Sequence, residues 1–189
     1  MIKPFINSLV AFGDKDFPIY EVSSLIQNSQ FSEENIEQYS YFSKDCYTRN
    51  KIYKDKNFEV LLLCWLPGQM APIHGHEGEK CWFKVIKGDL QINNYSIISE
   101  SPLKLKFEKT INASAGYLDG PADIHSIKNC SNRQVKTLHI YARPYDVCDI
   151  YNIEEKRIER LKMRYHSICL LYTSPSPRDR TRSRMPSSA

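Results

Sequence analysis

The sequence predicts a mainly β fold, a small β-barrel or jelly roll that follows a helical N-terminal part. The chain has 189 residues, of which 41% are hydrophobic and 25% charged, and this suits one globular domain with a hydrophobic core. From about residue 46 onward, short apolar runs are separated by turn residues at intervals of about 8 to 12 residues, which is typical of small β-barrels. We therefore expect a single domain over residues 1–168.

The N-terminal part has the pattern of helices. Ser32 is expected to cap a helix because Glu33 and Glu34 follow it and favour a first helical turn. This helix is predicted to run through Ile36 to Phe42. Weaker signals indicate a short helix over residues 22–27.

Strands are predicted next. The apolar run 58–66 has strand length and ends at Pro67-Gly68. The run 81–87 is a second strand, and Gly88-Asp89 forms the turn into a strand over 90–92. Four further strands are expected over residues 103–107, 111–113, 124–128 and 136–141. A helix over residues 153–160 is expected to close the domain.

Cysteine usage and hydropathy predict a cytoplasmic protein. The six cysteines have no spacing typical of a disulfide framework, so reduced thiols are expected. No apolar run approaches the length of a membrane helix. The apolar patch over residues 4–12 lacks the small-residue cleavage site of a secretory signal.

The C-terminal segment 169–189 differs from the rest in composition. Read alone, it is a disordered basic tail, and its arginines could indicate nucleic-acid binding. However, CLLYTSPSPRD and SRMPSSA resemble the translated ends of a sequencing adaptor, so we predict a non-native, disordered tail and exclude it from the fold. Its four arginines and one aspartate account for +3 of the net charge of +4, which leaves about +1 for residues 1–168. No nucleic-acid or membrane partner is expected.

Three histidines have the placement of metal ligands. His74 and His76 are two residues apart, and on a strand such side chains project to the same face. A lone histidine is more often a packed or exposed residue, but His125 supplies a third imidazole. Three imidazoles with open coordination positions suit Fe(II), although Zn, Mn, Ni or Cu would also accept them.

The glycines around these histidines have the spacing of a known motif. Gly68-x5-His74-x-His76 with the later Gly88 resembles the first motif of the cupin superfamily. The second cupin motif is represented in part, by Gly116, His125 and Asn129. The resemblance implies a small jelly-roll barrel with a metal held by His74, His76 and His125.

A polar row lies in the predicted strand 136–141. Alternation places Thr137, His139 and Tyr141 on one face, where burial without a shared hydrogen-bond network would be unfavourable. Cys81 stands where cupins usually have glutamate. It can be read as a small buried hydrophobe or as a functional neighbour of Tyr141, if both strands line the barrel interior.

Several segments together resemble the cysteine dioxygenases, the cupins that oxidise the thiol of free cysteine to a sulfinic acid. They cover roughly residues 36–168 and occur in the family's order. The matching segments are YTRN (47–50), LLLCW (61–65), PIHGHEGEKC (72–81), GDL (88–90), LHIY (138–141) and MRYHS (163–167).

The resemblance implies a role for each site residue. His74, His76 and His125 would bind Fe(II). Arg49, which by default would be a surface charge, would hold the substrate carboxylate with help from Tyr47. Tyr141 would lie beside the bound oxygen, with His139 and Thr137 orienting its hydroxyl, and Cys81 falls where animal-type enzymes form a thioether with that tyrosine.

The sequence departs from the family pattern at three places. Gly75 replaces the usual aspartate and should loosen the turn between the histidines. Thr137 replaces serine and keeps the hydroxyl. Ala142-Arg143-Pro144 replaces a Ser-Pro-Pro-like segment, so no cis-proline bond is available after Ala142, and Arg143 adds a charge near the expected substrate entrance.

The expected function is an Fe(II)-dependent dioxygenation of L-cysteine with O2, by a monomer. One alternative is the same reaction on another small thiol acid such as 3-mercaptopropionate, but related enzymes with that preference have glutamine where Arg49 stands. The other alternative is a catalytically silent cupin that binds a metal or a small ligand.

Overall fold

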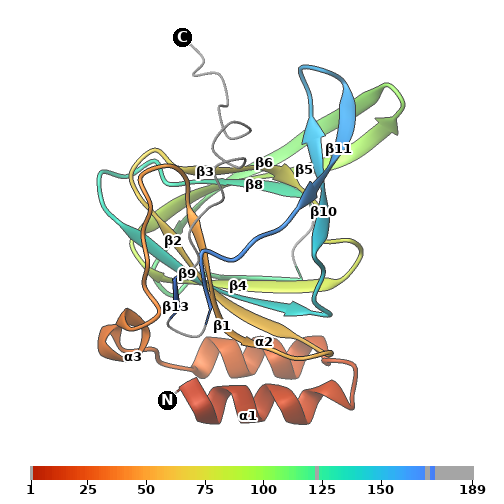
Figure 1. Cartoon of the computed structure of the whole chain (residues 1–189). Helices are drawn as coiled ribbons and strands as arrows, with labels where there is room; N and C mark the ends of the chain where they lie inside the picture. Colours follow the sequence, from red (N-terminus) through yellow and green to blue (C-terminus); the bar gives the residue numbers. More distant parts are fainter. Residues whose placement is uncertain (1, 122–123, 169–170, 173–189) are drawn as a thin grey trace.

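The computed structural model describes residues 2–121, 124–168 and 171–172 as two β-sheets that face each other, with three helices at one side (Figure 1). The first sheet has the strand order β13-β12-β1-β2-β9-β4-β7. Its strands are β1 (Thr48–Lys54), β2 (Glu59–Trp65), β4 (Lys80–Lys87), β7 (Leu118–Asp119), β9 (Val135–Ala142), β12 (Ser167–Ile168) and β13 (Leu171–Tyr172).

The second sheet has the order β11-β10-β3-β8-β5-β6. Its strands are β3 (Met70–His74), β5 (Asp89–Glu100), β6 (Leu103–Ser114), β8 (His125–Lys128), β10 (Val147–Asn152) and β11 (Arg157–Lys162). Neighbouring strands are antiparallel except for β1 and β12, which run parallel where Asn50 pairs with Ser167. The fold is mainly β, a cupin jelly roll with N-terminal helices, as the sequence predicted.

Alternation along the seven-stranded sheet divides the interior into two cores. Leu138 and Ile140 of β9 pack in the core beneath the helices. Tyr141 faces the opposite way, into the core between the two sheets, where it joins residues of β3, β5 and β8. The predicted two-faced pattern of β9 is therefore confirmed, and the polar face points into the barrel.

The helices cover the outer face of the seven-stranded sheet (Figure 1). They are α1 (Ile2–Gly13), α2 (Ile19–Asn28) and α3 (Glu33–Glu37). The Ser32 hydroxyl caps α3 by accepting from the Asn35 backbone N–H at 3.3 Å. Lys84 of β4 fixes the end of α2, because its Nζ donates to three carbonyl oxygens at 2.9–3.0 Å, those of Ile26, Gln27 and Ser29.

Several predicted boundaries were wrong. The expected helix over 153–160 is instead the turn and second strand of the β10–β11 hairpin, in which Asn152 accepts from the Glu155 backbone N–H at 3.0 Å. The strands expected over 103–107 and 111–113 form one strand, β6, which pairs with β5 along its length. The helix predicted to reach Phe42 ends at Glu37, and α1 was not predicted.

Three further expectations concern the chain as a whole. The five cysteines in the described part are free thiols, as expected. Within the described residues, no helix is long and apolar enough to cross a membrane. The predicted tail over 169–189 lies outside the described residues, apart from the backbone of Leu171–Tyr172 in β13, which pairs with β12.

Candidate functional site

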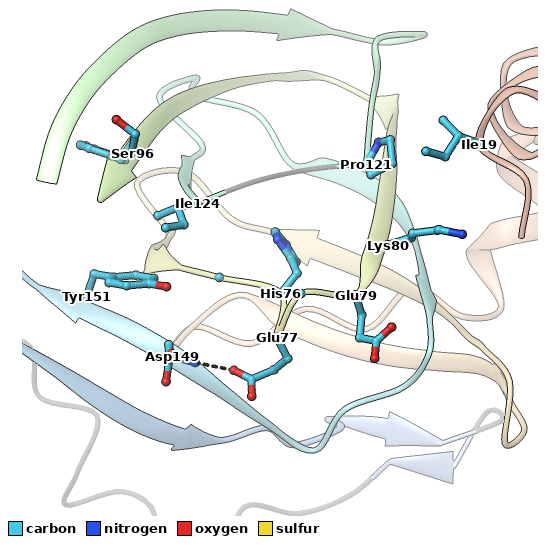
Figure 2. Close-up of a pocket in the computed structure, with 13 residues that line it drawn as sticks. Ile19, His76, Glu77, Glu79, Lys80, Ser96, Pro121, Ile124, Asp149 and Tyr151 are labelled. Atoms are coloured by element: carbon cyan, nitrogen blue, oxygen red, sulfur yellow. Dashed lines mark hydrogen bonds between the residues drawn. The ribbon is translucent and has the colours of Figure 1, made fainter. Parts of the chain in front are cut away.

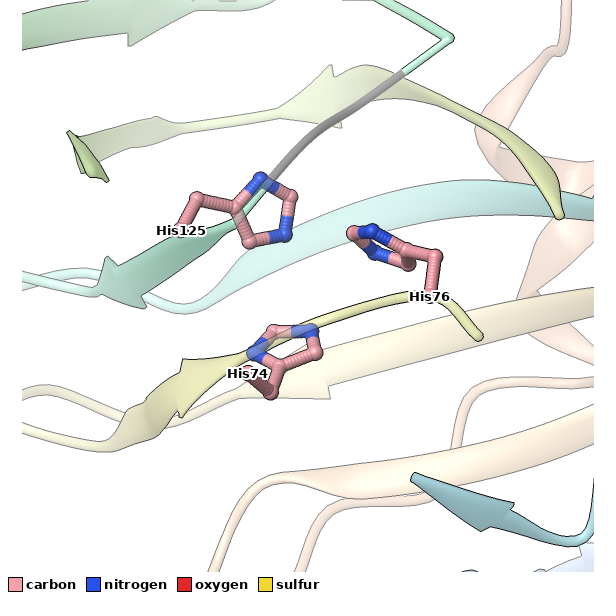
Figure 3. Close-up of side chains that lie close together, drawn as sticks. All are labelled: His74, His76 and His125. Atoms are coloured by element: carbon pink, nitrogen blue, oxygen red, sulfur yellow. The ribbon is translucent and has the colours of Figure 1, made fainter. Parts of the chain in front are cut away.

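The three predicted metal ligands lie together on the inner side of the six-stranded sheet (Figure 3). His74 ends β3 and pairs in register with His125, the first residue of β8. The sequence had suggested that His76 also lies on this strand. In the structure His76 lies two residues beyond the end of β3, in the following loop. One ligand atom from each residue lies within 4.8 Å of the others.

The donor set fits a divalent transition metal. The Nδ1–H of His74 donates to the Pro72 carbonyl at 2.9 Å, which leaves Nε2 as its ligand atom. Neither ring nitrogen of His125 has a hydrogen-bond partner among the described residues, although both are buried. Burial lowers the pKa of His74 and, more strongly, that of His125, so both imidazoles are neutral donors near pH 7.

Arg49 faces this cluster from the seven-stranded sheet. Its side chain is buried, and its guanidinium carbon lies 5.5 Å from the ring centre of Tyr141. Burial alone would lower the pKa of Arg49, but the facing tyrosines and Glu59 raise it, so the charge is retained. Its Nε has no hydrogen-bond partner among the residues that the structure describes. The arrangement offers a fixed cation to an anionic ligand.

The backbone of Arg49 is held from both sides by the segment that leads into β12. The Arg49 N–H donates to Nδ1 of His166 at 3.1 Å, and the His166 N–H donates to the Arg49 carbonyl at 2.8 Å. Tyr47 lies two residues before Arg49 and stacks on Trp65 with 4.4 Å between ring centres. These contacts fix the position of the Arg49 backbone in β1.

The polar row on β9 forms the shared hydrogen-bond network that the sequence required. The indole N–H of Trp65 donates to the Thr137 hydroxyl at 3.0 Å, and this hydroxyl lies 2.9 Å from Nε2 of His139. Burial lowers the pKa of His139 well below the ordinary value, so its imidazole is neutral near pH 7 and has one donor and one acceptor nitrogen. These two nitrogens serve the Thr137 hydroxyl and, at 3.3 Å from Nδ1, the Tyr141 hydroxyl.

Cys81 and Tyr141 are directly opposed in neighbouring strands. Cys81 of β4 pairs in register with Tyr141 of β9, so both side chains are on the face that lines the space between the sheets. Burial raises the pKa of the Cys81 thiol and, strongly, that of the Tyr141 phenol, while a hydrogen bond from Tyr141 favours the thiolate. Both groups are therefore protonated in the free protein near pH 7.

A cavity of about 780 Å³ has His76 in its wall, whereas His74, His125 and Arg49 do not line it (Figure 2). Its other walls include Glu77 and Asp149, and Arg160 bridges their two carboxylates at 2.8 Å each. The Tyr151 hydroxyl lies 3.1 Å from the position that a Cβ on Gly75 would take. The small residue between the histidines therefore makes room for Tyr151, and the Gly75 N–H is tied to the Asp149 carbonyl at 3.2 Å.

The segment that departs from the family pattern around Ala142 lies partly at the surface. The peptide bond between Ala142 and Arg143 is cis, although it involves no proline. Arg143 extends outward, where it is largely exposed and lies 3.3 Å from Asp16. The added charge therefore pairs at the surface beside the loop after α1.

Sequence reasoning found the three histidines, Arg49 and the β9 row but missed the residues that support them. Trp65 was given no role of its own, yet its indole N–H donates to the Thr137 hydroxyl. Glu59 was not singled out, although its buried carboxylate contacts Arg49 at 3.4 Å. A charged residue in the otherwise apolar run 58–66 was the one available signal for it.

The chain is similar to several known proteins. The family model described as cysteine dioxygenase type I matches residues 5–154. Cysteine dioxygenase type 1 of Rattus norvegicus is 23% identical over 161 residues, which cover 82% of this chain and 80% of that protein. The Homo sapiens protein of the same description is 22% identical with the same coverage. A Klebsiella pneumoniae structure with a double-stranded β-helix domain aligns with a TM-score of 0.49 and 17% identity, over 62% of this chain and 87% of that one.

Proposed function

This chain belongs to the cysteine dioxygenase type I family, and from that premise we propose that it is a non-haem Fe(II) enzyme that converts L-cysteine and O2 to cysteine sulfinic acid. The observation that carries the proposal is the cluster of three histidines faced by the buried cation of Arg49. A small ligand with a metal-binding thiolate at one end and a carboxylate at the other matches both parts of the site.

His74, His76 and His125 would hold the iron, which when bound supplies the redox chemistry of O2 activation and accepts the substrate thiolate. Arg49 would bind the carboxylate through the side of its guanidinium that carries the unpartnered Nε. Both oxygen atoms are transferred to sulfur. The sulfur loses four electrons and O2 gains four, so no external reductant is required.

Tyr141 would orient the reacting groups through its hydroxyl. If Nδ1 of His139 donates to the hydroxyl oxygen, the phenolic proton would go to Cys81 or to a ligand in the pocket. Thr137 and Trp65 would hold the imidazole ring in place. Tyr47 would assist by closing the wall beside Arg49.

The opposed pair Cys81 and Tyr141 supports a thioether crosslink as a further part of the proposal. A carbon–sulfur bond would replace the thiol S–H and one ring C–H of the tyrosine, and O2 would take up the two electrons and two protons. Intact mass should fall by two hydrogens after turnover with L-cysteine. A Cys81→Ser variant serves as the control, and an unchanged mass in the parent protein would exclude the bond.

Anaerobic loading with Fe(II), followed by L-cysteine and O2, tests the proposed activity, with stoichiometric cysteine sulfinate as the readout. If the protein at full iron occupancy forms no sulfinate from any small thiol, the dioxygenase function is excluded. A catalytically silent cupin that binds a metal would then remain. Activity that is higher on 3-mercaptopropionate than on L-cysteine would favour the other thiol acid.

Replacing Arg49 by Gln tests the substrate contact. The change should raise the KM for L-cysteine by about tenfold or more, because a charged hydrogen bond to the carboxylate is lost. The exposed Arg133→Gln is the matched control for loss of one positive charge. Equal KM values in the two variants would remove the assigned role of Arg49.

We also propose that the protein is cytoplasmic and monomeric, in keeping with its free thiols. Light scattering coupled to size-exclusion chromatography would test the monomer, and a mass of twice 22.0 kDa would contradict it.

A further inference from the structure

Glu59 is a fully buried carboxylate in the middle of the seven-stranded sheet. It pairs in register with Lys54 of β1 on one side and with Tyr141 of β9 on the other. Tyr141 in turn pairs with Cys81 of β4. Directly opposed residues project to the same face, so Glu59 belongs to a row of four side chains that ends beside the proposed reaction centre.

The two oxygens of Glu59 have different partners. Oε1 lies 3.4 Å from Nη2 of Arg49. Oε2 accepts from the Tyr165 hydroxyl and lies 3.9 Å from Nζ of Lys54. Lys54 also donates to the Tyr165 hydroxyl and to Asp146, each at 2.9 Å. The carboxylate is thus fixed from one side and contacts Arg49 with its other oxygen.

An isolated buried guanidinium is unfavourable, so Arg49 needs an anionic neighbour in the free protein. Glu59 is this neighbour, and it contacts only Nη2 of Arg49. Nε of Arg49 has no hydrogen-bond partner among the described residues. A planar guanidinium held at one nitrogen has a restricted orientation, and its remaining donors stay available to a ligand.

We propose that Glu59 is a positioning residue that orients Arg49 for the carboxylate of the thiol substrate, with Tyr165 and Lys54 fixing the glutamate. This inference rests on the proposed function, because it assigns a carboxylate-bearing thiol to the site. Glu59 acts through Arg49 and contacts no reacting atom. The selectivity for thiols that carry a carboxylate therefore depends on a residue outside the pocket wall.

The test measures binding without turnover. The Fe(II)-loaded protein is titrated anaerobically by calorimetry with L-cysteine and with cysteamine, which has the same thiol and amine but no carboxylate. Glu59→Ala should weaken L-cysteine binding by about tenfold or more and leave cysteamine within about twofold, because only the carboxylate contact is lost. Glu59→Gln keeps an oxygen for Arg49 and an amide for Tyr165, and it should restore L-cysteine binding to within about threefold of the parent protein.

Two further variants keep the test interpretable. Tyr165→Phe removes one support of the glutamate without creating an unpaired charge, and it should give a smaller loss confined to L-cysteine. The exposed Glu154→Gln removes one negative charge far from Arg49 and should change neither affinity. If Glu59→Ala does not fold, the comparison of Tyr165→Phe with the parent protein decides the question.

Three results would overturn the inference. Equal loss of both thiols would assign Glu59 a purely structural role. Tighter L-cysteine binding in the variants would mean that Glu59 competes with the carboxylate. A parent protein that binds the two thiols equally would show that Arg49 does not read the carboxylate. Each outcome is separate from the sulfinate assay, since a protein that binds L-cysteine selectively but forms no sulfinate would refute the activity and retain the role of Glu59.

Discussion

The Thr137 hydroxyl is the junction of the buried network on β9, and its removal gives a sharp test of that network. Valine has nearly the same shape, so Thr137→Val deletes the hydroxyl while filling the same space. The change leaves the Trp65 indole N–H and Nε2 of His139 without their partner, at contacts of 3.0 and 2.9 Å. All three residues are buried to within 3%.

The expected loss follows from these two contacts. A buried polar group left unpaired costs about 1–3 kcal/mol, so the two groups that Thr137→Val leaves unpaired should lower the free energy of unfolding by about 2–6 kcal/mol. Urea denaturation of the metal-free protein measures this value. Thr137→Ser keeps the hydroxyl and should lose only about 1 kcal/mol for the missing methyl group.

Controls separate the network from a general effect of threonine replacement. Thr110→Val removes an exposed hydroxyl that donates to Asn93 at 2.7 Å, and it should change the free energy of unfolding by less than about 0.5 kcal/mol. Trp65→Phe combined with Thr137→Val should lose less than the sum of the single changes, because the second removes the partner of the first. A Thr137→Val protein as stable as the parent would refute the assigned hydrogen bonds.

Four other outcomes are expected. Replacing His125 by Ala removes a candidate metal ligand, so Fe(II) affinity measured by equilibrium dialysis should fall by more than about 100-fold. Loss of a residue that only hydrogen-bonds to a ligand costs about 10–100-fold. Unchanged affinity would place the metal elsewhere. The metal-free protein should be most stable above the unfolded histidine pKa of about 6.5 and lose stability as the pH falls from 7.5 to 5.5, because burial lowers the pKa of His74, His125 and His139; a flat profile of unfolding free energy would contradict this. Lys84→Met should lower the free energy of unfolding by about 1.5–3 kcal/mol through loss of three carbonyl contacts, whereas exposed Lys104→Met should not. Gly88→Ala should destabilise more than Gly116→Ala, since both have positive φ but only at Gly88 would the new Cβ lie 2.8 Å from Val135; equal losses in thermal unfolding would refute the clash.

The sequence was sufficient for the β architecture and for several candidate site residues. His74, His76 and His125 could be singled out by their spacing and glycine frame, and Arg49 by its place in the segment YTRN, which resembles the cysteine dioxygenases. The alternation on β9 predicted its two faces because the side-chain period of a strand is two. These patterns are local in sequence.

The supporting contacts could not be predicted because they join distant parts of the chain. Trp65 and Thr137 are 72 residues apart, and Tyr165 and Glu59 are 106 residues apart. Residues 153–160 were misread as a helix because charged residues favoured helix locally, whereas pairing with β10 places them in a turn and in strand β11. These features depend on strand pairing and register between distant segments, which the local sequence pattern does not contain.

The site is divided between the two sheets, and this division has a consequence for how such a protein can change. The candidate metal ligands His74 and His125 lie on the six-stranded sheet, whereas Arg49 lies on the seven-stranded sheet. Phe83 of the seven-stranded sheet contacts both sides, with its ring centre 5.2 Å from that of His139 and 5.9 Å from that of His125. Substitutions on the six-stranded sheet would alter which metal is retained, and substitutions on the seven-stranded sheet would alter which thiol is chosen. The two properties can then diverge independently among related proteins as long as the Phe83 ring is kept.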